Sequence, residues 1–235
     1  MTDAALAAPS ARAMPTRGGL VGVVAAEATG TALLVAAIIG SGIAADQAFP
    51  HSPGLALLVN AIATGAALAA LIALGQVSAA FYPLVTLVAR ARRDLSTRQA
   101  AAAIGAQLTG AALGVTLANI MFALPPLTLA TAERADGPVL LGEFIATVGL
   151  LLVVVLTART RDPLRVGVAV GGYITAAMWF TSSTAFANPA VTLARIGTDT
   201  FTGINPASAA MFLAAQTLAL PAAYFLARLI TRSTP

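Results

Sequence analysis

The sequence predicts an all-α integral membrane protein with six membrane-spanning helices and two shorter helices that enter the membrane and stop midway. Three observations support this fold class: the composition, six long apolar runs, and a similarity between the two halves of the chain. Of the 235 residues, 58% are hydrophobic and only 9% are charged, whereas a typical soluble protein carries roughly 25% charged residues. This number of charged residues is too small to cover the surface of a soluble domain of this size. The lipid bilayer must therefore be the main solvent.

The rare residue types exclude several function classes. The chain has no cysteine and one histidine, His51, which excludes disulfides and cysteine-based metal sites and leaves no histidine cluster to bind a metal. We find no nucleophile–base pair and no phosphate-binding loop, so we expect neither an enzyme nor a bound cofactor. The basic residues are all arginines in short clusters between apolar runs. This pattern indicates membrane topology rather than a nucleic-acid partner.

Six apolar runs are long enough to cross a bilayer, which requires about 20 residues. They cover approximately residues 20–45, 54–77, 99–122, 138–158, 165–184 and 205–227. The first run is too long and starts too late for a cleaved secretory signal. Residues 1–18 form a polar tail that we expect to be disordered and cytoplasmic, and residues 19–235 form a single domain.

The arginines predict the orientation of the spans. With the N-terminus in the cytoplasm, eleven of the 13 basic residues face inward, and only Arg134 and Arg195 face outward. This bias follows the positive-inside rule and places both termini in the cytoplasm. An alanine-rich chain without lysine is typical of a GC-rich bacterium, so we expect a multi-pass protein of the bacterial plasma (inner) membrane.

Two apolar stretches, 79–91 and 185–196, are too short to span. Eight or nine helical residues rise about 12–14 Å, roughly half of the hydrocarbon core. Pro83 and Pro189 suit the first turn of a helix, and Asn188 is a good N-cap. Half-length helices are tolerated in a membrane only when they are buried in protein or line a watery cavity.

The halves of the chain, about 20–122 and 138–230, form a repeat. Glu27 is followed four residues later by a threonine, as is Glu143, and each of these pairs lies early in a span. The segment FYPLVTL likewise matches ANPAVTL. Because each half contains three spans, the second must be inverted, and such repeats place a permeation site near the midplane.

Together, these features resemble the aquaporin and glycerol-facilitator (major intrinsic protein) superfamily over about residues 20–230. NPAVTLAR and TDTFTGINPA further resemble its bacterial members associated with arsenic resistance. The resemblance implies two pore motifs, Asn188-Pro189-Ala190 and the altered Tyr82-Pro83-Leu84. We interpret a further copy, 205–207, as the start of the sixth span, because too few residues follow it for a half-helix and a span.

The resemblance also implies a four-residue selectivity filter, which an ungapped alignment places at Ile62, Ala176, Ala185 and Val191. Most family members have arginine at the position of Val191, and here all four residues are apolar. We therefore expect a wide filter without a fixed charge. Arg195, four residues beyond Val191, either replaces that charge in part or acts only as a cation at the C-terminus of the half-helix.

Tyr82 and the two buried glutamates each allow two interpretations. Tyr82 lines or narrows the pore, or it merely packs against a span. Glu27 and Glu143 hold the backbone of the re-entrant loops, as the resemblance implies, or they relay protons through the membrane.

The leading functional hypothesis is a passive channel for small uncharged solutes, namely glycerol-like polyols, arsenous acid and methylated arsenicals, with some water. One alternative is a proton-coupled transporter of inverted-repeat type, which would need a gradient. The other is an aquaporin-like protein that conducts poorly because Tyr82 gates it. The expected partners are a small neutral solute, the lipid bilayer and, by resemblance, three further copies in a homotetramer.

Overall fold

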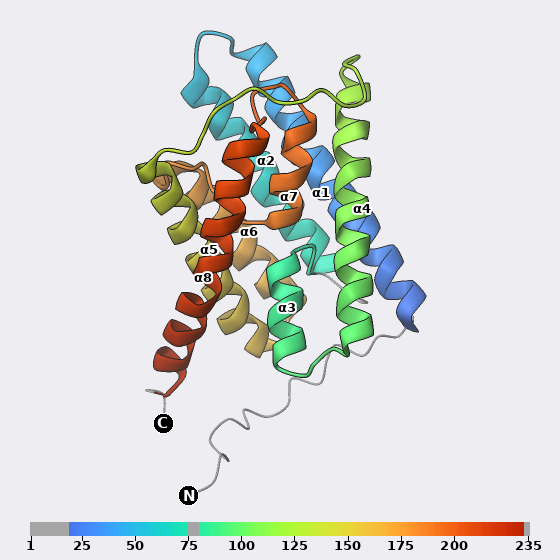
Figure 1. The fold of residues 1–235 in the computed structure, drawn as a ribbon, viewed down its shortest axis with the longest axis vertical. Helices are drawn as coiled ribbons and strands as arrows, with labels where there is room; N and C mark the ends of the chain where they lie inside the picture. Colours follow the sequence, from blue (N-terminus) through green and yellow to red (C-terminus); the bar gives the residue numbers. More distant parts are fainter. Residues whose placement is uncertain (1–18, 75–79, 233–235) are drawn as a thin grey trace, which may run out of the picture.

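The computed structural model describes residues 19–74 and 80–232, and this part of the chain is built from helices without strands (Figure 1). The predicted tail, residues 1–18, lies outside the described residues, as does Ala79 at the start of the first half-length segment. The α-helices are α1 (Gly19–Ala48), α2 (Pro53–Leu74), α3 (Pro83–Ala91), α4 (Thr97–Met121), α5 (Gly137–Thr157), α6 (Pro163–Phe180), α7 (Pro189–Ala194) and α8 (Pro206–Arg232). Short 3₁₀ turns follow α5 (Ala158–Thr160) and α7 (Arg195–Gly197).

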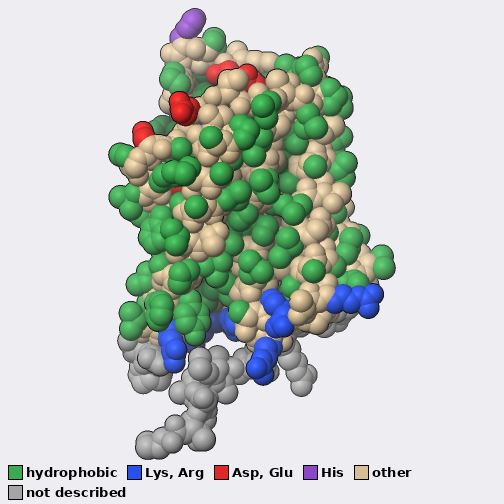
Figure 2. Space-filling view, in the orientation of Figure 1, with side chains coloured by type: hydrophobic (Ala, Val, Ile, Leu, Met, Phe, Trp, Pro, Cys, Tyr) green, Lys and Arg blue, Asp and Glu red, His purple; other side chains and the backbone are tan. Residues whose placement is uncertain are grey.

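The long helices form a bundle around the two short ones, α3 and α7 (Figure 1). Among the described helices, α1, α2, α4, α8 and α5 with its 3₁₀ extension are long and apolar enough to cross a membrane. The sixth span, α6, has 18 residues and packs along α2. Large hydrophobic side chains are exposed on the outside of the bundle (Figure 2), as expected when lipid is the solvent. The predicted six-span fold is therefore confirmed.

Small residues allow the spans to approach closely. Gly110 of α4 packs against α1 where an added Cβ would overlap the carbonyl oxygen of Ala28. Gly171 of α6 faces α2 in the same manner, against the carbonyl oxygen of Gly65. Close backbone approach is a usual source of helix association in lipid, where the hydrophobic effect contributes little.

Charged side chains gather at the two ends of the bundle. Figure 2 shows arginines at one end and acidic side chains toward the other. The arginine end includes the C-terminus of α3 with Arg90, the start of α4 with Arg98 and the start of α6 with Arg165. This segregation agrees with the pattern from which the cytoplasmic orientation of the termini was predicted.

The half-helices α3 and α7 meet at their N-terminal ends. The side-chain amide of Asn188, the N-cap of α7, donates to the carbonyl oxygen of Phe81 at 2.7 Å, next to Tyr82, the N-cap of α3. The two motifs therefore lie together despite their distance in sequence, as the repeat predicted. The further copy of the motif starts α8, as predicted, with the side-chain oxygen of Asn205 accepting from the N–H of Ser208 at 2.8 Å.

Candidate functional site

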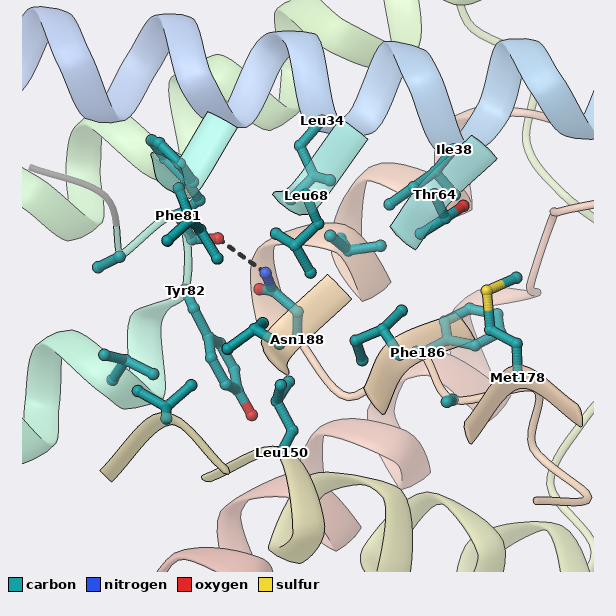
Figure 3. A pocket seen from close by; sticks show the side chains of 18 of the residues that line it. Leu34, Ile38, Thr64, Leu68, Phe81, Tyr82, Leu150, Met178, Phe186 and Asn188 are labelled. Atoms are coloured by element: carbon teal, nitrogen blue, oxygen red, sulfur yellow. Dashed lines mark hydrogen bonds between the residues drawn. The ribbon is translucent and has the colours of Figure 1, made fainter. Parts of the chain in front are cut away.

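A narrow cavity of about 80 Å³ lies where the half-helices meet (Figure 3). Aliphatic side chains from α1, α2, α5 and α6 make up most of its wall, including Leu34, Leu68, Leu150, Val170 and Ile174. The polar side chains on the wall are those of Thr64, Tyr82, Thr184, Asn188 and Arg195, and no described acidic residue lines the cavity. A mostly apolar passage with a few polar groups suits a small solute that carries hydroxyls.

Glu143 holds the loop that precedes α7. Its carboxylate accepts hydrogen bonds from the backbone N–H groups of Phe186, at 3.1 Å, and Ala187, at 2.6 Å. The side-chain amide of Gln216 on α8 donates to the same carboxylate at 2.7 Å and to the hydroxyl oxygen of Thr192 at 2.8 Å. The buried charge is thereby surrounded by three N–H donors.

Glu27 repeats this arrangement at the loop before α3. Its carboxylate accepts from the N–H groups of Ala80, at 3.1 Å, and Phe81, at 2.8 Å. The side-chain amide of Gln107 on α4 donates to it at 2.8 Å and to the hydroxyl oxygen of Thr86 at 3.0 Å. Both glutamates are fully buried, and neither lines the cavity.

The two glutamines in these clusters were not predicted from the sequence. Gln107 and Gln216 each lie in the third span of their half, within the matching dipeptides Ala106-Gln107 and Ala215-Gln216. An uncharged polar side chain in a span, repeated at equivalent positions of both halves, is the signal that could have identified them.

Asn188 and Tyr82 occupy equivalent positions but make different contacts. The side-chain oxygen of Asn188 accepts from the N–H of Ala190 at 2.9 Å and so caps α7. Tyr82 makes no side-chain cap, and its buried hydroxyl has no hydrogen-bond partner among the described residues. Figure 3 shows the ring along the cavity wall, with its hydroxyl near Leu150. Tyr82 therefore lies on the wall, rather than packing away from it.

The remaining motif residues shape the half-helices without lining the cavity. Pro83 and Pro189 are the first residues of α3 and α7, where the missing N–H of proline costs no helical hydrogen bond. Leu84 and Ala190 are buried in the core.

The structure corrects two of the four predicted filter positions. Ala185 and Val191 line the cavity, but Ile62 is 54% exposed on the outside of α2, and Ala176 is likewise exposed on α6. Thr64 and Met178, each two residues further along its helix, are on the wall instead. Two residues correspond to about 200° around a helix, so an ungapped alignment with this small offset selects the wrong helix face.

Two arginines lie near the cavity on the α7 side of Asn188. Arg195 lines the cavity, with its guanidinium carbon 3.3 Å from the centre of the Phe186 ring. The guanidinium carbon of Arg134, from the loop before α5, is 5.7 Å from the centre of the same ring. Arg134 also donates to the carbonyl oxygens of Phe201 and Gly203, and burial lowers the pKa of its guanidinium. The wall therefore carries a cation where the four apolar filter positions suggested none.

Six spans around two opposed half-helices, with a narrow passage where these meet, define a membrane channel of the aquaporin fold. The major intrinsic protein family model matches residues 16–182 of the chain. Over 205 residues the chain is 46% identical to the aquaglyceroporin AqpS of Rhizobium meliloti (strain 1021), a match that covers 86% of this chain and 87% of the relative. The chain therefore belongs to the major intrinsic protein family, whose aquaglyceroporins are channels and not enzymes.

A solved structure shows the same fold. The aquaglyceroporin from Plasmodium falciparum superposes with a TM-score of 0.68 at 21% sequence identity, covering 90% of this chain and 97% of the other. The family match includes the altered Tyr82 motif but ends before Asn188.

Proposed function

We propose that the chain is a passive membrane channel for small uncharged solutes: glycerol-like polyols, undissociated arsenous acid and methylated arsenicals, with some water. The observation that carries this proposal is the narrow, largely apolar cavity at the junction of the half-helices, with Asn188 and Tyr82 on its wall. The N-terminal ends of α3 and α7 carry partial positive charge, which disfavours cations and favours hydrogen-bond acceptors. The name of the 46% identical relative, an aquaglyceroporin, supports glycerol as the first solute to test.

The contacts of the glutamates favour a channel over a proton-coupled transporter. Glu27 and Glu143 are buried away from the cavity, and each accepts two backbone N–H bonds and one glutamine bond. A carboxylate that relays protons must exchange them with water or solute, whereas these two hold the loops in place. We therefore assign both a loop-supporting role.

One observation favours a restricted channel as a second candidate. The cavity is narrow, and the bulky Tyr82 ring forms part of its wall. In this version the channel conducts weakly, because the ring narrows the passage where most of the family has a small amide. Replacing Tyr82 with asparagine separates the two candidates, because removal of the ring raises the flux strongly only if the ring restricts the passage.

The assembly and orientation that we propose follow the family and the charge pattern. The protein lies in the inner membrane of a bacterium with both termini in the cytoplasm, which the arginine-rich end of the bundle supports. Four copies associate through the apolar outer faces of the spans, where small residues allow close contact.

The decisive experiment measures solute uptake by proteoliposomes. We expect vesicles with the protein to take up glycerol or arsenous acid faster than empty vesicles, without any proton or sodium gradient. Vesicles that pass water rapidly but exclude both solutes would contradict the proposal. Uptake that stops when a proton gradient is removed would instead support the coupled transporter.

A second variant tests the apolar wall at Val191. Val191→Arg adds bulk and a hydrated charge beside the cavity, so we expect glycerol uptake to fall more than water flux. Val191→Leu is the matched control, because it adds bulk without charge. Protein amounts in the membrane are measured in parallel, since a further buried cation with few acceptors around it reduces folding.

A further inference from the structure

Arg195 is a buried cation without an ion pair. It is only 5% exposed, although it lies at the end of a half-helix within the bundle. The ion pairs within 4.0 Å among the described residues, Arg92 with Asp94 and Arg165 with Asp162, do not involve it. A buried charge is costly unless other groups compensate it, and no described carboxylate lies at ion-pair distance from Arg195 to do so.

The contacts of Arg195 position its guanidinium but leave part of it free. Its Nε donates to the carbonyl oxygen of Thr202, and its plane lies against the Phe186 ring. The two terminal nitrogens make no hydrogen bond to any described residue. Since Arg195 lines the cavity, these nitrogens offer N–H donors to whatever passes through it.

The surroundings make this the most positive part of the cavity wall. Arg134 lies near the same Phe186 ring, and no described carboxylate lines the cavity. Val191, one helical turn earlier on α7, brings only a small apolar surface to the wall. Glu143 attracts the Arg195 guanidinium without making an ion pair with it, and Arg134 repels it, so the positive charge is offset only in part. A passing cation therefore meets a net positive charge in surroundings of low dielectric, whereas an uncharged solute meets N–H donors.

We propose that Arg195 is a specificity-determining residue of the pore: its terminal N–H groups donate to the oxygens of hydroxyl-rich solutes, and its charge rejects cations. The planar guanidinium suits a solute with two neighbouring oxygens, such as a vicinal diol, because its N–H groups form a rigid fork. The solute part of this inference rests on the proposed channel function. The cation part does not, because cation leak is measured without any solute.

The test compares Arg195→Leu and Arg195→Gln with the native protein in proteoliposomes. Leucine removes the charge and all donors, whereas glutamine removes the charge but keeps a donor that can reach the carbonyl of Thr202. In both variants we expect potassium leak to rise roughly tenfold, because a unit charge at close range dominates the barrier in low dielectric. We also expect the ratio of glycerol to water permeability to fall several-fold.

Arg134→Gln is the matched control, because Arg134 contacts the same aromatic ring without lining the cavity. It should change the leak and the ratio much less than Arg195→Gln does, because the Arg134 charge lies farther from the cavity. The double variant Val191→Arg with Arg195→Leu moves the guanidinium by one turn and should restore low leak, a rescue that a purely structural arginine would not show.

Unchanged leak and unchanged permeability ratio in a folded Arg195→Gln protein would overturn the inference. Folding of each variant is checked by thermal unfolding in detergent. If Arg195→Leu is misfolded, the permeability of the folded Arg195→Gln variant decides whether the inference holds. If native vesicles exclude glycerol while Arg195→Gln still raises potassium leak, the proposed function fails and the cation-rejecting role stands.

Discussion

The loops that precede α3 and α7 are held by nearly identical sets of hydrogen bonds. The side chains that the two loops and half-helices direct toward the pore, however, are different. In each, a glutamate binds two successive backbone N–H groups, and a glutamine joins that glutamate to a threonine. At the cavity wall, however, Tyr82 is the residue of the first half that is equivalent to Asn188. The positions equivalent to Phe186 and Arg195 are occupied by Ala80 and Ala89. The fold thus constrains the support, while the pore-facing residues differ between the halves.

The largest expected effect comes from removing the glutamates. Glu27→Ala and Glu143→Ala each leave two buried N–H groups and a glutamine without their acceptor, which should cost about 3–5 kcal/mol of stability. The equivalence of the two supports predicts similar losses, measured as thermal unfolding in detergent. Glutamine at either position keeps one acceptor oxygen and should cost less. A large loss at only one of the two sites would show that the supports are not equivalent.

The second prediction concerns the two N-caps. Asn188→Ala removes the cap on Ala190 and the bond to the Phe81 carbonyl, so we expect a loss of roughly 1–3 kcal/mol. Tyr82→Phe removes only a hydroxyl that has no partner among the described residues, so its stability should be unchanged or slightly higher. Equal losses in the two variants, in the same unfolding assay, would mean that Tyr82 supports α3 in the way that Asn188 supports α7.

Tyr82→Asn makes the two motifs more alike. A small amide replaces a bulky phenol at the cavity wall, so water or glycerol flux per protein should rise several-fold in a stopped-flow assay. Asparagine is also a better N-cap, worth up to ~1 kcal/mol for α3. Tyr82→Phe keeps the ring and controls for the loss of the hydroxyl alone. Unchanged permeability to every solute at equal protein level would mean that the ring does not restrict the pore.

The smallest effects are expected at the threonines. Thr86→Val and Thr192→Val keep the side-chain shape but remove a hydroxyl that accepts one glutamine N–H bond and donates to the backbone carbonyl oxygen of Tyr82 or Asn188, respectively. Each should cost about 1–2 kcal/mol, because a hydrogen bond has a net value of about 1 kcal/mol and the bond from Thr86 to Tyr82 is long. The comparison predicts nearly equal shifts in melting temperature, with solute selectivity unchanged because neither threonine lines the cavity. A change in selectivity would assign the threonine a role at the pore.

Sequence reasoning identified most of the repeated features, although it missed the repeated glutamines Gln107 and Gln216. Glu27 and Glu143 stand out because carboxylates are rare in spans, and α3 and α7 because each is apolar, too short to cross and preceded by a cap or proline signal. The third copy of the motif, at Asn205, was recognised as a helix start from the length of chain that follows it. These features follow from the thickness of the bilayer and from the chemistry of helix ends.

The rotation of each helix about its axis could not be obtained in this way. The ungapped alignment places the filter at Ile62 and Ala176, whereas Thr64 and Met178 line the cavity. In α2 the buried polar residues Asn60 and Thr64, four positions apart, mark the inward face, and an alignment without gaps does not use this signal. Arg195 stayed ambiguous for a different reason. Its place on the wall depends on stacking against Phe186 and on the 3₁₀ turn after α7, neither of which has a sequence signature.

The way that the glutamates hold the loops has a consequence for biosynthesis. At Phe81 and Ala187 the backbone is left-handed, with φ of 46° and 52°, and in each loop this residue and the one before it direct their N–H groups to one carboxylate. Because translation proceeds from the N-terminus, Glu27 and Glu143 emerge from the ribosome before the loops that they hold. Gln107 and Gln216 emerge after them. Each re-entrant loop can thus enter the membrane with its acceptor already in place, and the last span of its half then completes the cluster.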